Sequence, residues 1–309
     1  MTGPSAAPDR PAPEPAGAAT SASASEDVGR RREFLHFALR GPKVLISGSI
    51  LLLFLVVAIV GPIVRPGDAN AFVGPLGAAP DGMYWFGTTT FGQDVFAQFA
   101  NGLRTTFGAG LLGGGLAAII GMTIGFVAGY RGGLVDEILG MVTNVVLVIP
   151  TLALLIVVTA YLSARGIVVE ALFIGLTSWP WAARAIRAQT FSLATREFVD
   201  LARISGVRGL RVIFSEIAPN MSSYLFLSFI LLFGGAILIA ASLDFIGLGP
   251  TEGSSLGLMM YNAVAWGALP LGLWWWFIPP GIGITAIVGA LYVLNVGLDE
   301  IFNPRLRES

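Results

Sequence analysis

Six long runs of apolar residues constrain this chain more than any other feature. Each run can cross a hydrocarbon core, which needs about 20 mostly apolar residues in a helix. Of the 309 residues, 55% are hydrophobic and only 12% are charged, a balance that ordinary soluble domains do not show. We therefore predict an all-α membrane protein with six transmembrane helices, over Val44–Val64, Thr106–Tyr130, Ile138–Leu162, Val168–Ile186, Ser222–Gly247 and Leu273–Leu298.

The segments between these runs divide the chain into parts. The first 29 residues are rich in Pro, Ala and Ser and lack an apolar core, which is typical of disorder. The predicted parts are a disordered cytoplasmic tail (1–29), a basic juxtamembrane segment (30–43), the first span (44–64), an extracytoplasmic segment (65–105), and a core (106–309) with five spans and a polar loop at 195–220.

The positions of Lys and Arg predict how the chain is oriented, because basic residues near span ends are retained on the cytoplasmic side. With the N-terminus inside, only Arg65, Arg104 and Arg165 of the 18 Lys and Arg residues fall outside. An even number of spans then returns the chain to the side from which it started. We expect a multi-pass protein with both termini in the cytoplasm.

The chain offers few residues for catalysis or for holding a cofactor. Its only lysine, Lys43, precedes Val44 rather than Ser or Thr, so the phosphate-binding loop of a Walker-type ATPase is excluded. It has no cysteine, and its only histidine, His36, lies before the first span. We therefore expect no catalytic residue, no metal site and no bound cofactor. Any ATP hydrolysis would come from a partner.

Asp244 is the one acidic residue deep inside a predicted span, where charges are costly and usually functional. Glu170 and Asp136 fall near span ends. Three roles for Asp244 stay open: a contact with solute in a pathway, a capped or paired structural carboxylate, and the coupling site of an ion-driven secondary transporter. The paired structural role ranks first, and the inverted repeats expected of many secondary transporters are not visible in the sequence.

The second predicted span has one face made almost entirely of small residues. They recur every four positions, at Gly113, Ala117, Gly121, Gly125 and Gly129. Such a face lets another helix approach closely. We expect a contact with another helix of the same chain, and the alternative is an interface with a second membrane subunit.

The loop at 195–220 is the one long polar insert between apolar spans. Its segment EFVDLARISG, Glu197 to Gly206, offers two apolar faces at helical spacing: Phe198, Leu201 and Ala202, or Val199, Ala202 and Gly206. This predicts a short amphipathic helix that ends at a glycine and inserts into a groove of a soluble partner. The alternative is a helix that lies on anionic lipid headgroups.

The same loop resembles the EAA motif of ABC-importer permeases, in which an acidic-small-small triplet precedes a glycine and a proline follows at a fixed distance. Here the triplet is Asp200, Leu201 and Ala202, the glycine is Gly206 and the proline is Pro219. The departures are Asp200 for Glu, Leu201 for Ala, Glu216 for Ile or His, and Ala218 for Leu. The spacing is intact, so we expect the loop to keep its fold.

Further stretches resemble the C-type permease subunit of dipeptide and oligopeptide importers. FGTTTFGQDVFAQFANGLRTTF, from Phe86, is similar to the family's GTDxxGRDVxSRxxxGxRxSL, and AGYRGGLVDEILGMVTNVVLVIP, from Ala128, is a second match. SLDFIGLGP, from Ser242, stands where the family has LSFLGLG, and FNPRLR, from Phe302, matches the family's DPRLR. With the loop, these stretches cover nearly everything after residue 84.

This resemblance implies a type I ABC-importer permease fold with a cytoplasmic coupling helix, in a bacterial or archaeal cell membrane. Such a chain pairs with a second homologous permease subunit in the lipid bilayer. Two cytoplasmic ATPase subunits bind ATP and Mg, an extracytoplasmic solute-binding protein delivers solute, and no nucleic acid takes part. The residues that would couple to the ATPase are Glu197, Asp200, Leu201, Ala202, Arg203 and Gly206.

The solute class follows from the resemblance less directly. This permease class is associated with di- and oligopeptides, with nickel and, in some branches, with oligosaccharides. Ala240 stands where many peptide permeases carry Glu, Gln93 replaces the Arg of the GRDV motif, and the segment after Pro250 is aromatic. Because tryptophans stack on sugar rings, an oligosaccharide stays an alternative. Peptide is our first expectation, on class frequency alone.

Overall fold

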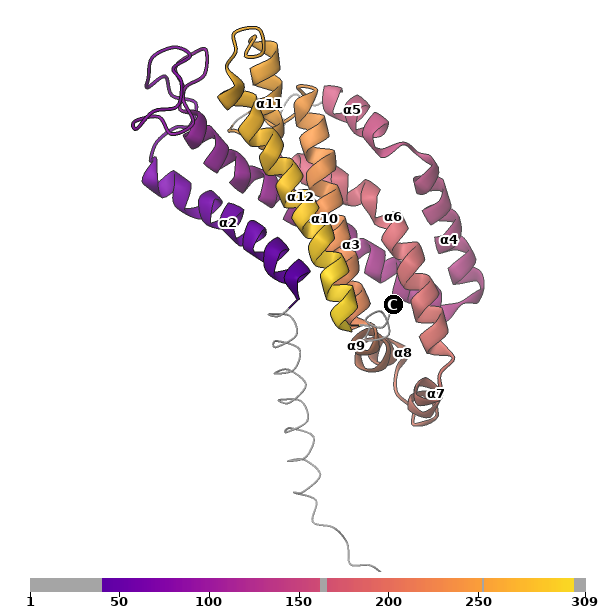
Figure 1. Ribbon diagram of the computed structural model, residues 1–309. Coiled ribbons are helices and arrows are strands. Elements are labelled where there is room, and N and C mark those ends of the chain that lie inside the picture. The colour runs from indigo at the N-terminus through magenta and orange to yellow at the C-terminus, as the bar shows by residue number, and fades with distance from the viewer. Residues whose placement is uncertain (1–40, 162–165, 252, 303–309) are drawn as a thin grey trace, which may run out of the picture.

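The structure, a computed structural model, describes residues 41–161, 166–251 and 253–302. These residues fold into helices joined by loops (Figure 1). The helices are α2 (Pro42–Val64), α3 (Val95–Arg131), α4 (Gly133–Val148), α5 (Thr151–Tyr161), α6 (Ile167–Ala194), α7 (Glu197–Ile204), α8 (Gly209–Val212), the π-helix η1 (Ile213–Ile217), α9 (Ala218–Asn220), α10 (Ser222–Phe245), α11 (Leu256–Ala265) and α12 (Trp274–Phe302). The predicted tail and the FNPRLR ending after Phe302 lie outside the described residues.

Within the described residues, four helices are long and apolar enough to cross a membrane: α2, α3, α10 and α12. They correspond to the first, second, fifth and sixth predicted spans. The pair α4 and α5 passes the same test when taken together, which makes a fifth candidate. The fourth predicted span lies in α6, which is 28 residues long but carries Glu170, Arg184 and Arg187 and is not among these candidates.

The third predicted span is broken rather than straight. Its two halves, α4 and α5, meet at an angle of 75°. Pro150 lies at the break and the preceding Ile149 has extended backbone, with φ −75° and ψ 120°, as expected before a proline. Proline also lacks the N–H that would continue the helix. The predicted end of this span, Leu162, lies outside the described residues.

The second span begins eleven residues earlier than Thr106, because Asp94 caps the helix. Its carboxylate accepts hydrogen bonds from the backbone N–H groups of Phe96, at 2.9 Å, and Ala97, at 3.2 Å. These donors have no partner within the helix. The predicted extracytoplasmic segment, 65–105, therefore includes the first turns of α3.

The small-residue face of α3 packs against α6, and this is the most extensive helix contact among the described residues. A Cβ atom added at Gly125 would lie 2.8 Å from the Cβ of Ile186, and one at Gly129 would lie 2.6 Å from the backbone oxygen of Arg187. The first expectation for this face, a contact within the chain, is thus confirmed.

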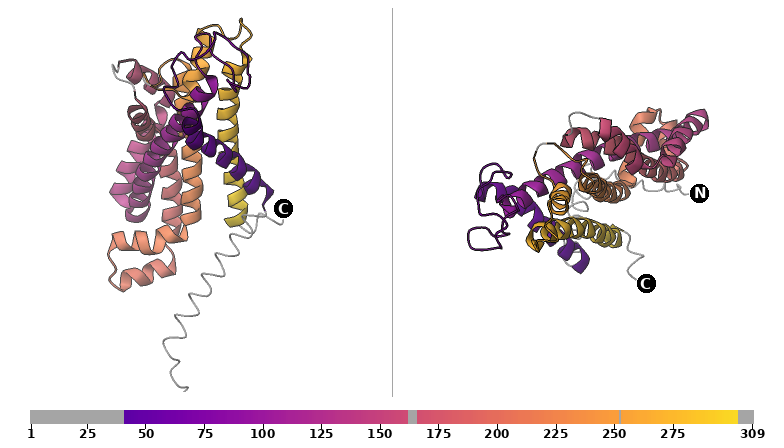
Figure 2. Two further views of the ribbon diagram at one scale, coloured as in Figure 1. Left: turned by 90° about the vertical axis from the view of Figure 1, so that its left-hand side faces the viewer. Right: turned by 90° about the horizontal axis from the view of Figure 1, so that it is seen from above.

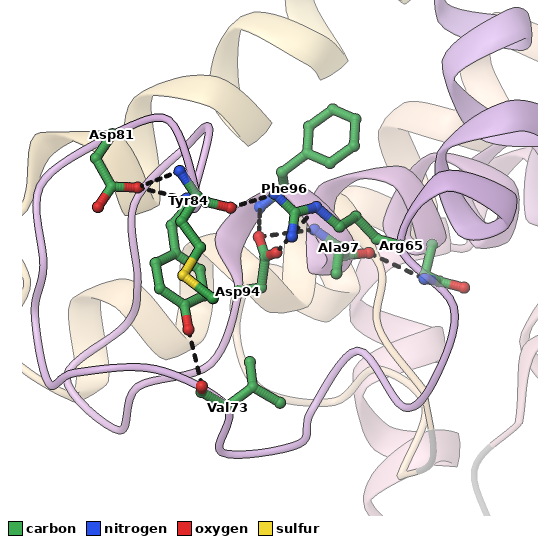
Figure 3. A network of polar contacts seen from close by, with 9 residues as sticks. Arg65, Val73, Asp81, Tyr84, Asp94, Phe96 and Ala97 are labelled. Carbon is green, nitrogen blue, oxygen red and sulfur yellow. Dashed lines mark hydrogen bonds and ion pairs between the residues drawn. The ribbon is translucent and has the colours of Figure 1, made fainter.

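The loop between α2 and α3 forms a compact cap that polar contacts hold together (Figure 3). Arg65 lies over the ring of Trp85, with 5.3 Å from its guanidinium carbon to the ring centroid, and its Nε is 3.7 Å from Oδ2 of Asp94. The Tyr84 hydroxyl donates to the backbone oxygen of Val73 at 2.8 Å. These contacts fix the entry of the chain into α3.

The remaining long helices pack around α3. In the described chain α10 contacts α3, α6 and α12, while α2 contacts α3 and α12 and lies at the edge of the bundle (Figures 1 and 2). Lys43 forms an ion pair with Glu300 where α2 meets the end of α12. The cap lies at one end of the molecule, and α7, α8 and α9 lie at the other (Figure 1).

Candidate docking site on the 195–220 loop

The loop between α6 and α10 folds into four short helical pieces, α7, α8, η1 and α9. They lie beyond the ends of the long helices, at the end of the molecule away from the cap (Figures 1 and 2). The predicted amphipathic helix is present as α7, Glu197–Ile204. Its predicted residues therefore lie on one short, projecting element.

One face of α7 is buried and holds it on the loop. Val199 is 0% exposed, and its core cluster includes Val212 and Ile217, which are also buried. Phe198 and Ala202 are partly buried against this cluster. The two apolar faces that the sequence offers are therefore mixed: Val199, Phe198 and Ala202 pack inward, whereas Leu201 and Gly206 are exposed.

The other face of α7 exposes apolar side chains. Leu201 is 64% exposed and Ile204 is 84% exposed. Leu210 in α8 and Phe214 in η1 are also large apolar residues that are exposed. We call Leu201, Ile204, Leu210 and Phe214 the outer patch. Large exposed apolar side chains on a projecting element are typical of a surface that a partner covers.

Of the outer patch, the apolar faces predicted from the sequence include only Leu201. Ile204 follows Leu201 by one helical turn, and this spacing could have predicted that Ile204 lies on the same exposed face. Leu210 and Phe214 lie outside α7, and their exposure depends on how α8 and η1 fold back. No local sequence pattern gives that information.

The charged residues of α7 stabilise the helix and tie it to α3. Asp200 and Arg203 form an exposed ion pair, with 3.3 Å between Arg203 Nη1 and Asp200 Oδ1. The guanidinium carbon of Arg203 also lies 5.0 Å from the centroid of the Tyr130 ring, at the end of α3. Glu197 lies exposed in the first turn, where a negative charge suits the helix dipole.

Gly206 ends α7 in the left-handed conformation, with φ +76°. Its N–H donates to the oxygen of Arg203 at 3.0 Å, and the N–H of Val207 donates to that of Ala202 at 3.1 Å. These two bonds form a Schellman motif, in which glycine is favoured because it has no Cβ. The prediction that the helix ends at this glycine is confirmed.

Asp244 lies far from this loop in the fold, at the last turn of α10 near the cap end (Figure 1). It is 3% exposed and accepts a hydrogen bond from the hydroxyl of Ser255. Glu170, from α6, is also buried, and Oε1 of Glu170 and Oδ1 of Asp244 are buried without a hydrogen-bond partner among the described residues. The hydrogen bond from Ser255 fits a structural role for Asp244, and its role in a solute pathway stays a prediction.

The surroundings of Asp244 are closely packed. A Cβ atom added at Gly249 would lie 2.3 Å from Oδ1 of Asp244, and one at Gly257 would lie 2.7 Å from its Cβ. The cavity beside Glu170 has a volume of about 10 Å³, which is room for one water molecule at most. Among the described residues, no cluster of three or more His, Cys, Asp or Glu could hold a metal ion.

Comparison with known proteins places the chain in a family. Residues 121–308 match the model of the binding-protein-dependent transport system inner membrane component. The chain is 29% identical to the dipeptide transport system permease protein DppC of Bacillus subtilis, over 93% of this chain and 88% of that protein.

A second similar protein is the oligopeptide transport system permease protein OppC of Mycobacterium bovis, which is 30% identical over 92% of this chain and 97% of its own length. The DppC protein of Alkalihalophilus pseudofirmus is 29% identical over 87% of this chain and 88% of its own length. Because the family model covers more than half of the chain, this protein belongs to the family of binding-protein-dependent transport system inner membrane components.

Proposed function

We propose that this chain is the six-span permease subunit of an ATP-driven peptide importer, and that the outer patch of the 195–220 loop is where a cytoplasmic ATPase subunit docks. Peptide is the proposed solute because the similar proteins are named as dipeptide and oligopeptide permeases. A second permease subunit, a second ATPase subunit and an extracytoplasmic solute-binding protein would complete the complex. Both termini would lie in the cytoplasm, on the side of α7.

The single observation that carries the docking proposal is the two-sided character of α7. Its inner face is fixed by Val199, whereas Leu201 and Ile204 stay exposed on the other side. A fixed inner face makes α7 a rigid contact that passes displacement on to the long helices instead of deforming. An exposed apolar face is also what a helix needs to insert into a groove of a partner.

The proposed sixth span is α6. It is 28 residues long, or about 42 Å at 1.5 Å per residue, which exceeds a hydrocarbon core of about 30 Å. It packs along α3, which is itself a candidate span. Its low apolarity comes from Arg184 and Arg187 near the α7 end and from Glu170, which is buried against Asp244 instead of facing lipid.

The exposed arginines near α7 support the orientation. Arg196, Arg208 and Arg211 lie in or beside the loop, and Arg131 ends α3 at the same end of the molecule. Basic residues that flank spans are retained in the cytoplasm. An ion-coupled secondary transporter is the weaker candidate, because Asp244 is enclosed by Ser255 and Glu170 in this structure.

The test is the substitution Leu201→Lys in the complete importer. Removing a buried leucine from an interface loses about 1.5–3 kcal/mol, which corresponds to roughly 10- to 100-fold weaker binding. We expect the ATPase subunits to be lost during purification in mild detergent. Leu134→Lys is the matched control, because Leu134 is also an exposed leucine, outside the outer patch. Equal retention of ATPase by both variants would contradict the docking proposal.

A further inference from the structure

A polar groove lies between α4 and α6, with one wall from α3. Its volume is about 480 Å³, within the range of sites that bind small molecules. Among its lining residues are Asp136, Glu137 and Asn144 from α4, and Arg184 and Arg187 from α6. The outer patch does not include any of them, so the groove is a separate feature of the fold.

The polar groups of the groove are ordered by contacts across the two helices. Arg184 Nη2 donates to Oδ1 of Asn144 at 2.6 Å. Arg187 donates to both carboxylate oxygens of Asp136, with 2.5 Å between Nη2 and Oδ2. A guanidinium has five N–H donors, so Arg184 keeps donors for a ligand after its bond to Asn144. Glu137 and Arg184 are exposed in the described chain.

The positions of Arg184 and Asn144 along their helices indicate what kind of surface can cover them. Arg184 precedes the end of α6, at Ala194, by ten residues, which is about 15 Å along a helix. Asn144 follows the start of α4 by eleven residues, or about 16 Å. Because α6 is about 42 Å long and a hydrocarbon core is about 30 Å thick, these positions lie near the α7-side boundary of the membrane. Exposed polar and charged groups there face water or another polar surface, because contact with hydrocarbon is costly.

The charges of the groove indicate which class of molecule it can bind. Two acidic residues balance two basic residues, so an anionic lipid headgroup gains little net attraction. The opposite charges instead suit a molecule that carries both signs. Elsewhere α4 exposes apolar residues, such as Ile138 and Val142, which suit lipid or an apolar protein surface.

We infer that the α4–α6 groove lines the solute path on the α7 side of the permease and binds the termini of a zwitterionic peptide. Arg184 takes the carboxylate, Glu137 takes the ammonium group, and Asn144 offers an amide to the peptide backbone. This inference rests on the proposed function. The inference adds to the proposed function a location for the solute and a reason why the importer would select peptides with free termini.

The absence of cysteine from the chain gives a direct test. Asn144→Cys places a thiol in the groove, and Val142→Cys places one on an exposed part of α4 outside the groove lining. Each variant is assembled into the complete importer in lipid nanodiscs. A charged, membrane-impermeant thiol reagent is added with or without a saturating dipeptide, and labelling of this chain is followed by mass spectrometry.

We expect the Asn144→Cys thiol to be labelled at least tenfold faster than the Val142→Cys thiol, and the dipeptide to slow its labelling at least fivefold. No labelling of the groove thiol would show that protein or lipid covers it, and would overturn the inference. Protection by added anionic lipid instead of peptide would overturn it too. If wild-type importer moves peptide while labelling is unaffected by peptide, the inference fails and the proposed function stands.

A second measurement separates the role of Arg184 from general damage. Arg184→Gln keeps a donor to Asn144 but removes the charge. We expect the KM for a dipeptide with a free carboxylate to rise about tenfold, the loss of about 1.4 kcal/mol, while a carboxyl-amidated dipeptide keeps its wild-type KM. An equal change for both peptides would contradict the assignment of Arg184 to the carboxylate. Absence of any peptide uptake by wild type would overturn the proposed function itself.

Discussion

At the scale of single residues, the fold depends on glycines whose missing side chains let helices touch. Along α3, Gly121 faces α6 so closely that an added Cβ would lie 3.1 Å from the Cβ of Ala182, and Gly113 would meet Ile174 at the same distance. In a membrane, such close approach is a main source of helix association, because lipid chains are as apolar as leucine.

The first prediction concerns Gly125. In Gly125→Ala the new methyl group would lie 2.8 Å from the Cβ of Ile186, so α3 and α6 must separate. Overpacking of this kind costs about 1–3 kcal/mol. We expect a lower midpoint in thermal unfolding of the purified protein in detergent. Gly115→Ala is the control, since nothing lies within 4 Å of its added Cβ. Equal stability of the two variants would contradict the packing described here.

At the scale of elements, local spacing predicted α7 well and its orientation less well. The EFVDLARISG segment gave the helix, its length and its glycine end, because these depend on neighbours in sequence. It left two apolar faces open, since the choice depends on Val212 and Ile217, which approach only when the loop folds. The proximity of Asp244 to Glu170 could not be predicted from the sequence for the same reason, because it arises only when α6 and α10 pack together.

The spans show which features of a transmembrane helix cannot be predicted from its apolar run alone. Runs of apolar residues located α2, α3, α10 and α12, and the bounds differed where a side chain or a proline acts locally. Asp94 extends α3 toward the cap, and Pro150 breaks the third span. In α6, charged residues face the groove or pair inside the protein. They lower the mean apolarity of this helix, although its apolar run predicts a span.

The second prediction concerns the end of α7. Gly206→Val forces a β-branched residue into φ +76°, which costs on the order of 1–3 kcal/mol. We expect the Schellman motif to open and ATP-driven uptake to fall severalfold at equal membrane abundance. Gly206→Asn is the matched control, because asparagine tolerates this conformation. Uptake by the valine variant equal to that of the asparagine variant would argue against α7 as the coupling element.

At the scale of the whole molecule, the chain leaves long apolar surfaces uncovered. In α2, Leu52, Leu53, Ile59 and Ile63 are exposed. In the described chain the main helix contacts of α2 are with α3 and α12. Its remaining surface needs lipid or a second membrane subunit, and the family to which the chain belongs consists of transport system components.

The third prediction is therefore about assembly. Tagged protein purified from its native membrane in mild detergent should bring a second multi-span permease and a Walker-type ATPase, identified by mass spectrometry. A tagged Leu201→Lys protein should keep the permease and lose the ATPase, because only the outer patch is altered. Recovery of the wild-type protein alone, moving solute without ATP, would contradict an importer assembly.

The close seam between α3 and α6 has a mechanical consequence. The glycines of α3 let side chains of α6, such as Ile186 and Thr190, pack directly against the α3 backbone, so the two helices move together as one rigid unit. This unit carries α7 beyond one end of α6 and Glu170 in the first turn at the other end. Over the length of α6, a turn of about 10° moves the far end by roughly 7 Å. A small rotation about the α7 end would thus become, at the other end of α6, a displacement comparable to the width of a peptide.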